Sequence, residues 1–130
     1  MREIDGAIND LSRQVIGAAI EVHRILGPGY LESVYEEALA TEMKARGIEF
    51  KRQFLVPIQY KSHEVGNAKL DFLVADQLVL ELKAVDGIAP IHKAQVISYL
   101  RALKPPLGLL MNFNVEVMRS GIHRVILSTS

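Results

Sequence analysis

The sequence contains no cysteine, carries no net charge and has no long apolar run, and each absence excludes a class of protein. Without cysteine the chain can form neither a disulfide nor a cysteine-ligated zinc site, and this suits a reducing compartment. Apolar runs such as Val15 to Ile20 stop far short of the ~18 residues that a membrane span needs. The start, Met1 to Asp10, mixes acids with Arg2 and is unlike a secretory signal. We therefore expect a soluble, cytoplasmic protein with no membrane partner.

The balance of 15 Lys and Arg against 15 Asp and Glu excludes a basic tail or a generally cationic surface, which dominates non-specific nucleic-acid binders. The charges nevertheless alternate in blocks. Residues 31–43 hold four Glu and no base, and residues 62–86 hold five acids against two Lys. Residues 44–61 and 87–130 each hold five bases against a single acid. The neutral total therefore conceals acidic and basic segments.

The chain of 130 residues, 49% of them hydrophobic, has the size and composition of one globular domain, which we expect to span residues 1–130. Apolar residues recur at steps of three and four from Ile4 to Ile25, which predicts a long amphipathic helix. After the turn Gly27-Pro28-Gly29, a second helix follows from Leu31 and ends at Gly47. So short a link predicts that the two helices pack antiparallel.

The period of the apolar residues changes to two at Phe50, which predicts a strand from Phe50 to Tyr60. Pro90 suits the first turn of a later helix, which Pro105-Pro106 would end. The other predicted elements are strands near Ala68–Ala75, Leu78–Val85, Leu107–Phe113 and Ile122–Leu127, and a helix over Pro90–Leu103. The predicted order is αα-βββ-α-ββ, a single domain of the α/β (or α+β) class.

Charged residues interrupt two of these strands at positions that are otherwise typical of burial. Asp71 lies between two apolar residues, and alternation places Glu81 and Lys83 on one face of an apolar strand. If three residues, 75–77, connect the strands, Asp71 falls directly opposite Glu81. A two-residue turn would instead send the two acids to opposite faces of the sheet, so a joint site requires the odd-length connection.

Two like charges opposite each other destabilise a sheet, so the acid pair needs a compensating partner. A hard divalent cation such as Mg2+ is one, because it binds one or two carboxylates together with waters and phosphate oxygens. Lys83 would then orient or deprotonate a water, or stabilise charge on a phosphate. The alternative is that Glu81 and Lys83 form the solvated face of an edge strand, with Asp71 exposed.

The arrangement of Asp71 followed by Glu81-Leu82-Lys83 resembles the D-x(n)-(D/E)-x-K signature of the PD-(D/E)XK nuclease superfamily, although Leu70 replaces its proline. A second motif, Gly29-x-x-Glu32-x-x-Tyr35, resembles the one that names the GxxExxY family of small PD-(D/E)XK-like proteins. The resemblance covers roughly residues 11–126. It implies an αβββαβ restriction-endonuclease-like core with a central mixed β-sheet, Mg2+ or Mn2+ as cofactor, and nuclease activity.

The resemblance also implies roles for the residues of the second motif. Glu32 corresponds to a helix glutamate that adds to the metal site in such nucleases, although a carboxylate in a first turn also suits the helix macrodipole. Gly29 has a structural role of its own, because Gly-Pro-Gly lets the chain reverse and start a helix. Tyr35 is expected to pack near the site.

On the later helix, Gln95 and Tyr99 resemble the Q-x-x-x-Y motif of exonuclease branches of the superfamily. A spacing of four places them on one face, and His92 joins them there. The resemblance implies that these residues contact substrate, by reaching a phosphate or stacking on a base. The alternative is a polar helix face with a half-buried tyrosine.

The leading hypothesis is therefore a metal-dependent nuclease in which Asp71, Glu81 and Glu32 hold Mg2+ or Mn2+ and Lys83 positions the attacking water. The basic segments would hold the nucleic acid, with DNA favoured over RNA. The alternative is a non-catalytic nucleic-acid- or protein-binding module that keeps the nuclease fold, because a neutral, bare core has little with which to grip a substrate. The apolar stripe of the first helix leaves surface for a second copy, so we also predict a homodimer.

Overall fold

The computed structural model describes residues 6–127, and its elements follow the predicted order. The helices are α1 (Gly6–Leu26), α2 (Glu32–Ala45) and α3 (Pro90–Leu103), the strands are β1 (Phe50–Tyr60), β2 (His63–Val74), β3 (Leu78–Lys83), β4 (Leu107–Asn112) and β5 (Ile122–Val125), and a 3-10 helix, η1, spans Met118–Gly121. Ile4, where the predicted helical stripe begins, lies outside the described residues. None of the helices within residues 6–127 is both long and apolar enough to cross a membrane.

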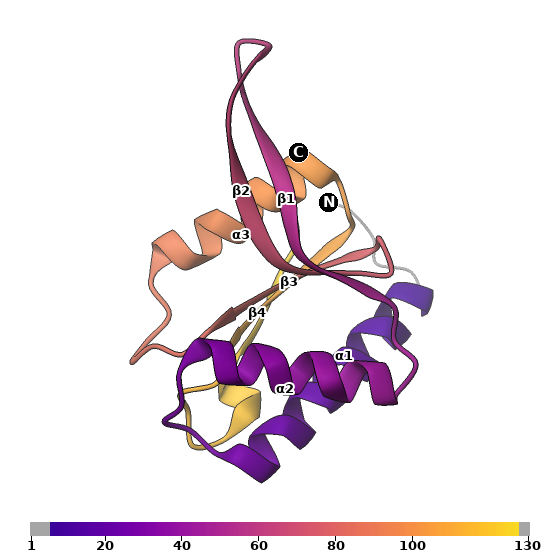
Figure 1. The fold of residues 1–130 in the computed structure, drawn as a ribbon, viewed down its shortest axis with the longest axis vertical. Helices are drawn as coiled ribbons and strands as arrows, with labels where there is room; N and C mark the ends of the chain where they lie inside the picture. Colours follow the sequence, from indigo (N-terminus) through magenta and orange to yellow (C-terminus); the bar gives the residue numbers. More distant parts are fainter. Residues whose placement is uncertain (1–5, 128–130) are drawn as a thin grey trace.

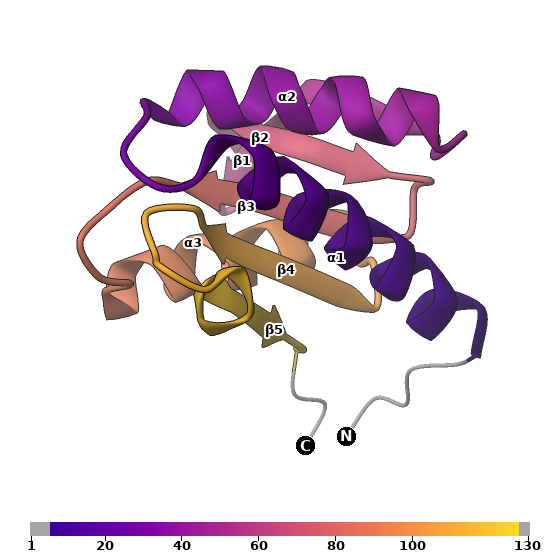
Figure 2. The same cartoon turned by 90° about the horizontal axis from the view of Figure 1, so that it is seen from below.

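The five strands form one mixed sheet in the order β1-β2-β3-β4-β5. Neighbours are antiparallel except β3 and β4, which run parallel because α3 carries the chain back between them. Figure 2 shows α1 and α2 on one side of the strands, with α3 on the other. The predicted fold class, an α/β domain with a central mixed sheet, is confirmed for the described part of the chain.

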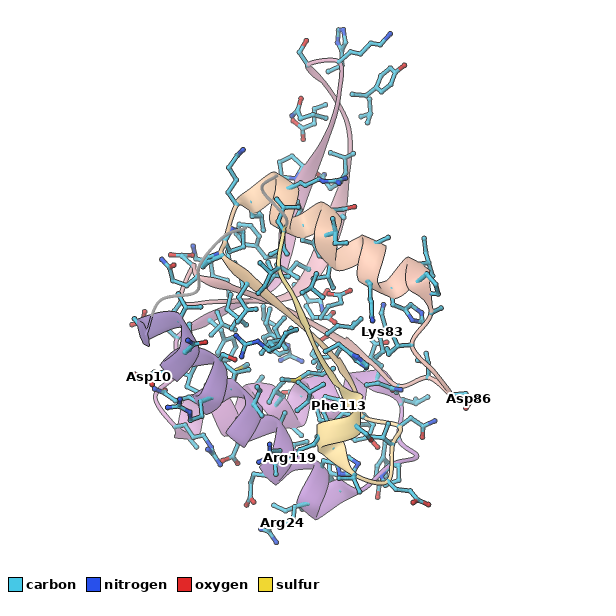
Figure 3. The ribbon with its side chains drawn as sticks, turned by 180° about the vertical axis from the view of Figure 1, so that it is seen from behind. Asp10, Arg24, Lys83, Asp86, Phe113 and Arg119 are labelled. Carbon is cyan, nitrogen blue, oxygen red and sulfur yellow. The ribbon has the colours of Figure 1, made fainter. Side chains whose placement is uncertain are left out.

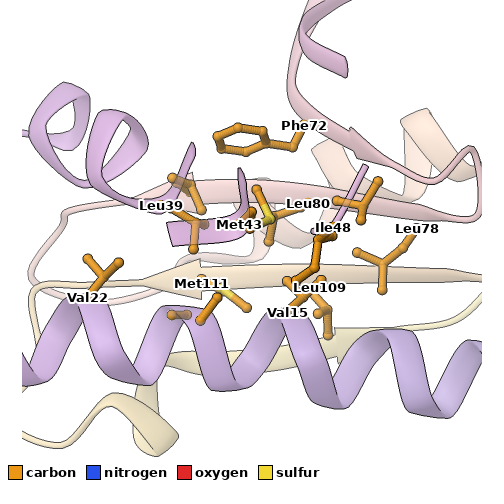
Figure 4. Close-up of a cluster of buried hydrophobic side chains, with 14 of the residues drawn as sticks. Val15, Val22, Leu39, Met43, Ile48, Phe72, Leu78, Leu80, Leu109 and Met111 are labelled. Carbon is orange, nitrogen blue, oxygen red and sulfur yellow. The ribbon is translucent and has the colours of Figure 1, made fainter. Parts of the chain in front are cut away.

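The larger core lies between the sheet and the helix pair α1 and α2, which run in opposite directions as predicted (Figure 1). Val15 and Val22 of α1 and Leu39 and Met43 of α2 pack against strand residues such as Leu80 (Figure 4). The apolar stripe of α1 therefore faces the core of its own chain. The homodimer stays a prediction.

The reversal between α1 and α2 depends on Gly29 and Tyr35. Gly29 has a φ of +109°, a conformation that L side chains rarely adopt. The hydroxyl of the buried Tyr35 donates to the carbonyl of Gly27 at 2.6 Å and accepts from the N–H of Tyr30 at 3.2 Å. Its ring stacks on Phe113, with 4.7 Å between the ring centroids. The outer residues of the G-x-x-E-x-x-Y motif thus fix the turn from which α2 starts.

The strands β1 and β2 form a long twisted hairpin that projects beyond the rest of the sheet (Figure 1). The two strands pair along their whole length, whereas β2 pairs with β3 only through residues 72–74. All residues from 57 to 67 are exposed, and we call this segment the arm. The second strand therefore begins at His63, ahead of its predicted start near Ala68, because a strand without a buried face shows no apolar alternation.

Candidate active site

The predicted acid pair lies where β2 diverges from β3. The connection between the strands is the three-residue segment 75–77, and Val74 pairs with Leu78. The odd-length connection on which the joint site depended is therefore confirmed. The same register, continued along the two strands, places Asp71 opposite Glu81.

Side chains replace the strand ladder at this point. The last backbone pair between β2 and β3 is Phe72 with Leu80. Beyond it, the N–H of Leu82 donates to Oδ2 of Asp71 at 2.8 Å, and the N–H of Asp71 donates to Oε1 of Glu81 at 3.1 Å. The two carboxylates satisfy the backbone groups that the parting strands leave free, and this holds them at the fork between β2 and β3. We call this place the fork.

Both acids at the fork are buried, since Asp71 is 7% exposed and Glu81 is 3% exposed. Burial, reinforced by the negative charge of Asp71, raises the pKa of Glu81 to about 8. Burial also raises the pKa of Asp71. The alternative of a solvated edge strand is wrong, because β3 lies in the middle of the sheet and both carboxyl groups are shielded from water. Without a cation, Glu81 is therefore mainly protonated at neutral pH.

Lys83 links the fork to α3. Its Nζ donates to Oε1 of Gln95 at 3.1 Å and lies 3.8 Å from Oε2 of Glu81. Nε2 of Gln95 in turn donates to the hydroxyl of Tyr99 at 3.2 Å, and that hydroxyl donates to the carbonyl of Lys69 at 3.0 Å. Figure 3 shows Lys83 close to the N-terminal end of α3. The structure thus brings Gln95 and Tyr99 together with the predicted catalytic lysine.

Tyr99 and His92 have partners within the fold. Tyr99 is only 2% exposed, and burial, with the charge of Glu81, raises its pKa to about 12. The ring has no open face on which a base could stack, and its hydroxyl is hydrogen bonded to Gln95. His92 accepts a hydrogen bond at Nδ1 from the N–H of Ala89 at 2.9 Å, which closes the first turn of α3. Contact of these side chains with substrate stays a prediction.

Glu32, the third predicted metal ligand, lies in the first turn of α2 and is partly buried. Burial raises its pKa, the negative charge of Asp71 raises it further, and the positive charge of Lys83 opposes both effects. Glu32 therefore lies within electrostatic range of the fork. No side chain caps the start of α2, so the macrodipole is the only property of the helix itself that favours a carboxylate at Glu32.

Two residues that were not predicted from the sequence, Gln53 and Glu36, are connected to Asp71, the first directly and the second through Gln53. Nε2 of Gln53 donates to Oδ1 of Asp71 at 3.2 Å and to Oε1 of Glu36 at 2.7 Å. Arg52 donates to the other oxygen of Glu36 at 2.7 Å. Gln53 also has a φ of +51°, which is strained for a residue other than glycine. Glu36 lies one helical turn after Glu32, and that spacing could have indicated it; nothing in the strand pattern indicated Gln53.

The donor atoms at the fork suit a hard divalent cation, but they do not form a closed cage. Within residues 6–127, no three His, Asp or Glu side chains are grouped closely enough to hold a metal ion, so the predicted convergence of Asp71, Glu81 and Glu32 is not preformed. Mg2+ needs only one or two protein carboxylates, since waters and phosphate oxygens complete its shell. Asp71 and Glu81 supply that number, and a bound cation would offset the cost of ionising both buried carboxyl groups.

Comparison with known proteins agrees with this fold. A crystal structure of an alkaline exonuclease from Laribacter hongkongensis has a similar fold, with a TM-score of 0.53 at 11% sequence identity. The similarity covers 98% of this chain and 73% of the exonuclease chain. No curated protein matches the sequence. Residues 9–125, which include every residue of the fork, match a family model that describes the PD-(D/E)XK nuclease superfamily. The chain therefore belongs to the PD-(D/E)XK nuclease superfamily.

Proposed function

We propose that the protein is a metal-dependent nuclease that hydrolyses phosphodiester bonds at the fork between β2 and β3. The observation that carries this proposal is the buried pair Asp71 and Glu81 with Lys83 beside it. Membership of the nuclease superfamily supports the reaction class, and the buried carboxylates support Mg2+ or Mn2+ as the cofactor. The Gly29, Glu32 and Tyr35 motif supports a finer placement in the GxxExxY family.

In this proposal the residues of the fork have separate roles. Asp71 and Glu81 would hold the ion, with Glu32 approaching from α2. A bound ion would polarise the scissile phosphate and stabilise the leaving oxygen. Lys83 has three N–H donors, of which Gln95 takes one and Glu81 faces another, so one is free to orient a water or a phosphate oxygen.

The test is cleavage of labelled single- and double-stranded DNA and RNA with Mg2+ or Mn2+. We expect Lys83→Ala, Glu81→Gln and Asp71→Asn to lose activity, while Arg13→Ala, at an exposed position of α1 outside both basic segments, keeps it. Removal of a positioned acid–base group costs about 100-fold to 10,000-fold in rate. Cleavage that persists in both Lys83→Ala and Glu81→Gln would contradict the proposal.

A non-catalytic binding module is the second candidate, and the lack of a preformed three-ligand cluster in residues 6–127 favours it. Calorimetry separates the two candidates without any activity assay. The nuclease proposal expects the protein to bind Mn2+ and expects Asp71→Asn to lose that binding. A protein that binds no divalent ion at pH 8, where Glu81 is half ionised, would support the module instead.

A further inference from the structure

We propose that the arm and the outer face of α3 bind duplex DNA beside the fork, with the arm in the major groove and α3 along one phosphate backbone. The proposal rests on the proposed nuclease function and names its substrate class. It is carried by three features: a projecting hairpin whose apolar side chains are exposed, exposed bases that form no salt bridge within residues 6–127, and a groove between the hairpin and α3.

Apolar side chains of the arm are exposed to solvent in the described part of the chain. Ile58, Tyr60 and Val65 are 38%, 60% and 60% exposed, although they lie on paired strands. A two-stranded hairpin without further support is marginally stable in water. A partner that covers the arm would bury these side chains and stabilise the hairpin.

The charge on this side of the protein is positive. Lys61 at the tip of the arm and Lys93 and Arg101 on α3 are exposed, and none of them forms a salt bridge within residues 6–127. The whole segment 87–115 contains no acidic residue, and Glu64 is the sole acid of the arm. Bases without acidic partners are complementary to phosphate groups, and their contacts release counterions from a nucleic acid.

A groove connects the arm to α3 and so to the fork. It has a volume of about 560 Å³, with Pro57 and Ile58 on the arm side and Ser98 and Arg101 on the α3 side. Figure 1 shows α3 running behind the base of the hairpin. Gln95, which contacts Lys83, lies three residues before Ser98 of the groove on α3, a rise of about 4.5 Å. A nucleic acid in the groove would therefore pass close to the candidate active site.

The shape of the arm favours B-form DNA over other partners. Lys61 and Ser62 both have positive φ, which makes a tight two-residue turn and a narrow tip. A two-stranded ribbon fits the major groove of B-DNA, which is about 12 Å wide, but not the deep and narrow major groove of duplex RNA. Tyr60 is the one aromatic residue of the arm, too few for a stacking platform along a single strand. A second copy is disfavoured at the outer edge, because Pro57 on the edge strand β1 has no N–H to offer another strand.

The test measures DNA binding by fluorescence anisotropy in EDTA, where no cleavage occurs, with a labelled 20-base-pair duplex over a range of salt concentrations. The variants are Lys61→Asn, which tolerates the positive φ of the turn, and Arg101→Gln, which keeps the helix. Arg13→Gln on α1, an exposed position outside both basic segments, is the matched control. We expect each variant, but not the control, to weaken binding about fivefold to tenfold at 0.1 M salt and to lower the slope of log K against log salt by about 1.

Competition with single-stranded DNA and duplex RNA completes the experiment, and we expect both to bind more weakly than duplex DNA. Unchanged affinity and slope in both variants, with circular dichroism showing normal folding, would overturn the proposal. Equal binding of single strands or of RNA would overturn it as well. The proposed nuclease function is tested separately. Cleavage with Mg2+ together with unchanged binding in the variants would contradict the DNA-binding role of the arm and support the nuclease function. Weakened binding in the variants without any cleavage would support the DNA-binding role and contradict the nuclease function.

Discussion

Replacement of Glu81 by glutamine should remove a pH-dependent loss of stability. In the folded protein without metal, the pKa of Glu81 is raised from 4.5 to about 8. The folded state therefore holds a proton that the unfolded state has released, so the stability from this group is full below pH 4.5 and is lost as the pH rises through 8. A shift of this size corresponds to about 5 kcal/mol at 1.36 kcal/mol per pKa unit.

Glutamine has nearly the same shape as protonated glutamate and cannot ionise, so Glu81→Gln keeps its stability at high pH. We expect the difference in free energy of unfolding between the variant and the wild type to grow in favour of the variant by up to about 5 kcal/mol between pH 4.5 and 9. The assay is urea unfolding in EDTA, followed by circular dichroism at several pH values. Glu49→Gln, at an exposed position, is the control whose difference should stay flat.

The same substitution should abolish the effect of metal. Adding Mg2+ at pH 8.5 should stabilise the wild type but not Glu81→Gln, because an ion that binds only the folded state shifts unfolding by mass action. Calorimetry in two buffers should show release of about one proton per bound ion at pH 7, and much less at pH 9. If stability curves of wild type and variant run parallel from pH 5 to 9, Glu81 does not hold a proton at neutral pH and the electrostatic account of the fork is wrong.

Two further substitutions test the groups that support the site. Gln53→Gly removes the amide that holds Asp71 and also relieves the strained φ of +51°, so calorimetry should show Mn2+ binding weakened about tenfold while the melting temperature stays level or rises; weakened binding with a lower melting temperature would point to unfolding instead. Tyr35→Phe keeps the ring stacked on Phe113 but leaves two backbone partners of the hydroxyl unsatisfied. Thermal unfolding should therefore show that the free energy of unfolding falls by about 1–3 kcal/mol. A loss below 0.5 kcal/mol would mean that the motif tyrosine does not fix the turn.

The acid pair of the site could be predicted from the sequence because it depends only on whether the connection between the two strands has an odd or an even number of residues. Once two strands are joined by three residues, the residues that oppose each other follow by counting, and Asp71 must meet Glu81. The charge of both residues then makes the pair unusual enough to notice. Spacing along a helix works in the same way: it placed Gln95 and Tyr99 on one face, and the two side chains are hydrogen bonded in the structure.

The rest of the site depends on contacts between distant parts of the chain, which no local pattern carries. Gln53 reads as an ordinary polar residue of an alternating strand, and its positive φ and its bonds to two acids arise only when β1 crosses α2. The hydroxyl of the buried Tyr99 donates its hydrogen bond to the carbonyl of Lys69, which lies thirty residues away in the sequence. The arm escaped prediction for a related reason, since exposed strands bury no face and so lack the apolar alternation by which strands are recognised.

The zero net charge of the chain is compatible with a DNA-binding surface, because several acids are paired with bases elsewhere and two are buried at the fork. On α2, Glu36 and Glu37 bind Arg52, and Glu42 binds Arg46, so acids there already have basic partners.

The two acids at the fork are buried, and they hold a proton between them at neutral pH. In the proposed complex, the exposed bases of α3 and the arm tip would contact phosphates, with Glu64 as the one acid of the arm. A divalent ion would add positive charge at the fork and leave those bases unchanged. The salt dependence of DNA binding in EDTA should thus report the arm and α3 alone, and the increase in affinity with Ca2+ should report the fork, so the two contributions are separable in one protein.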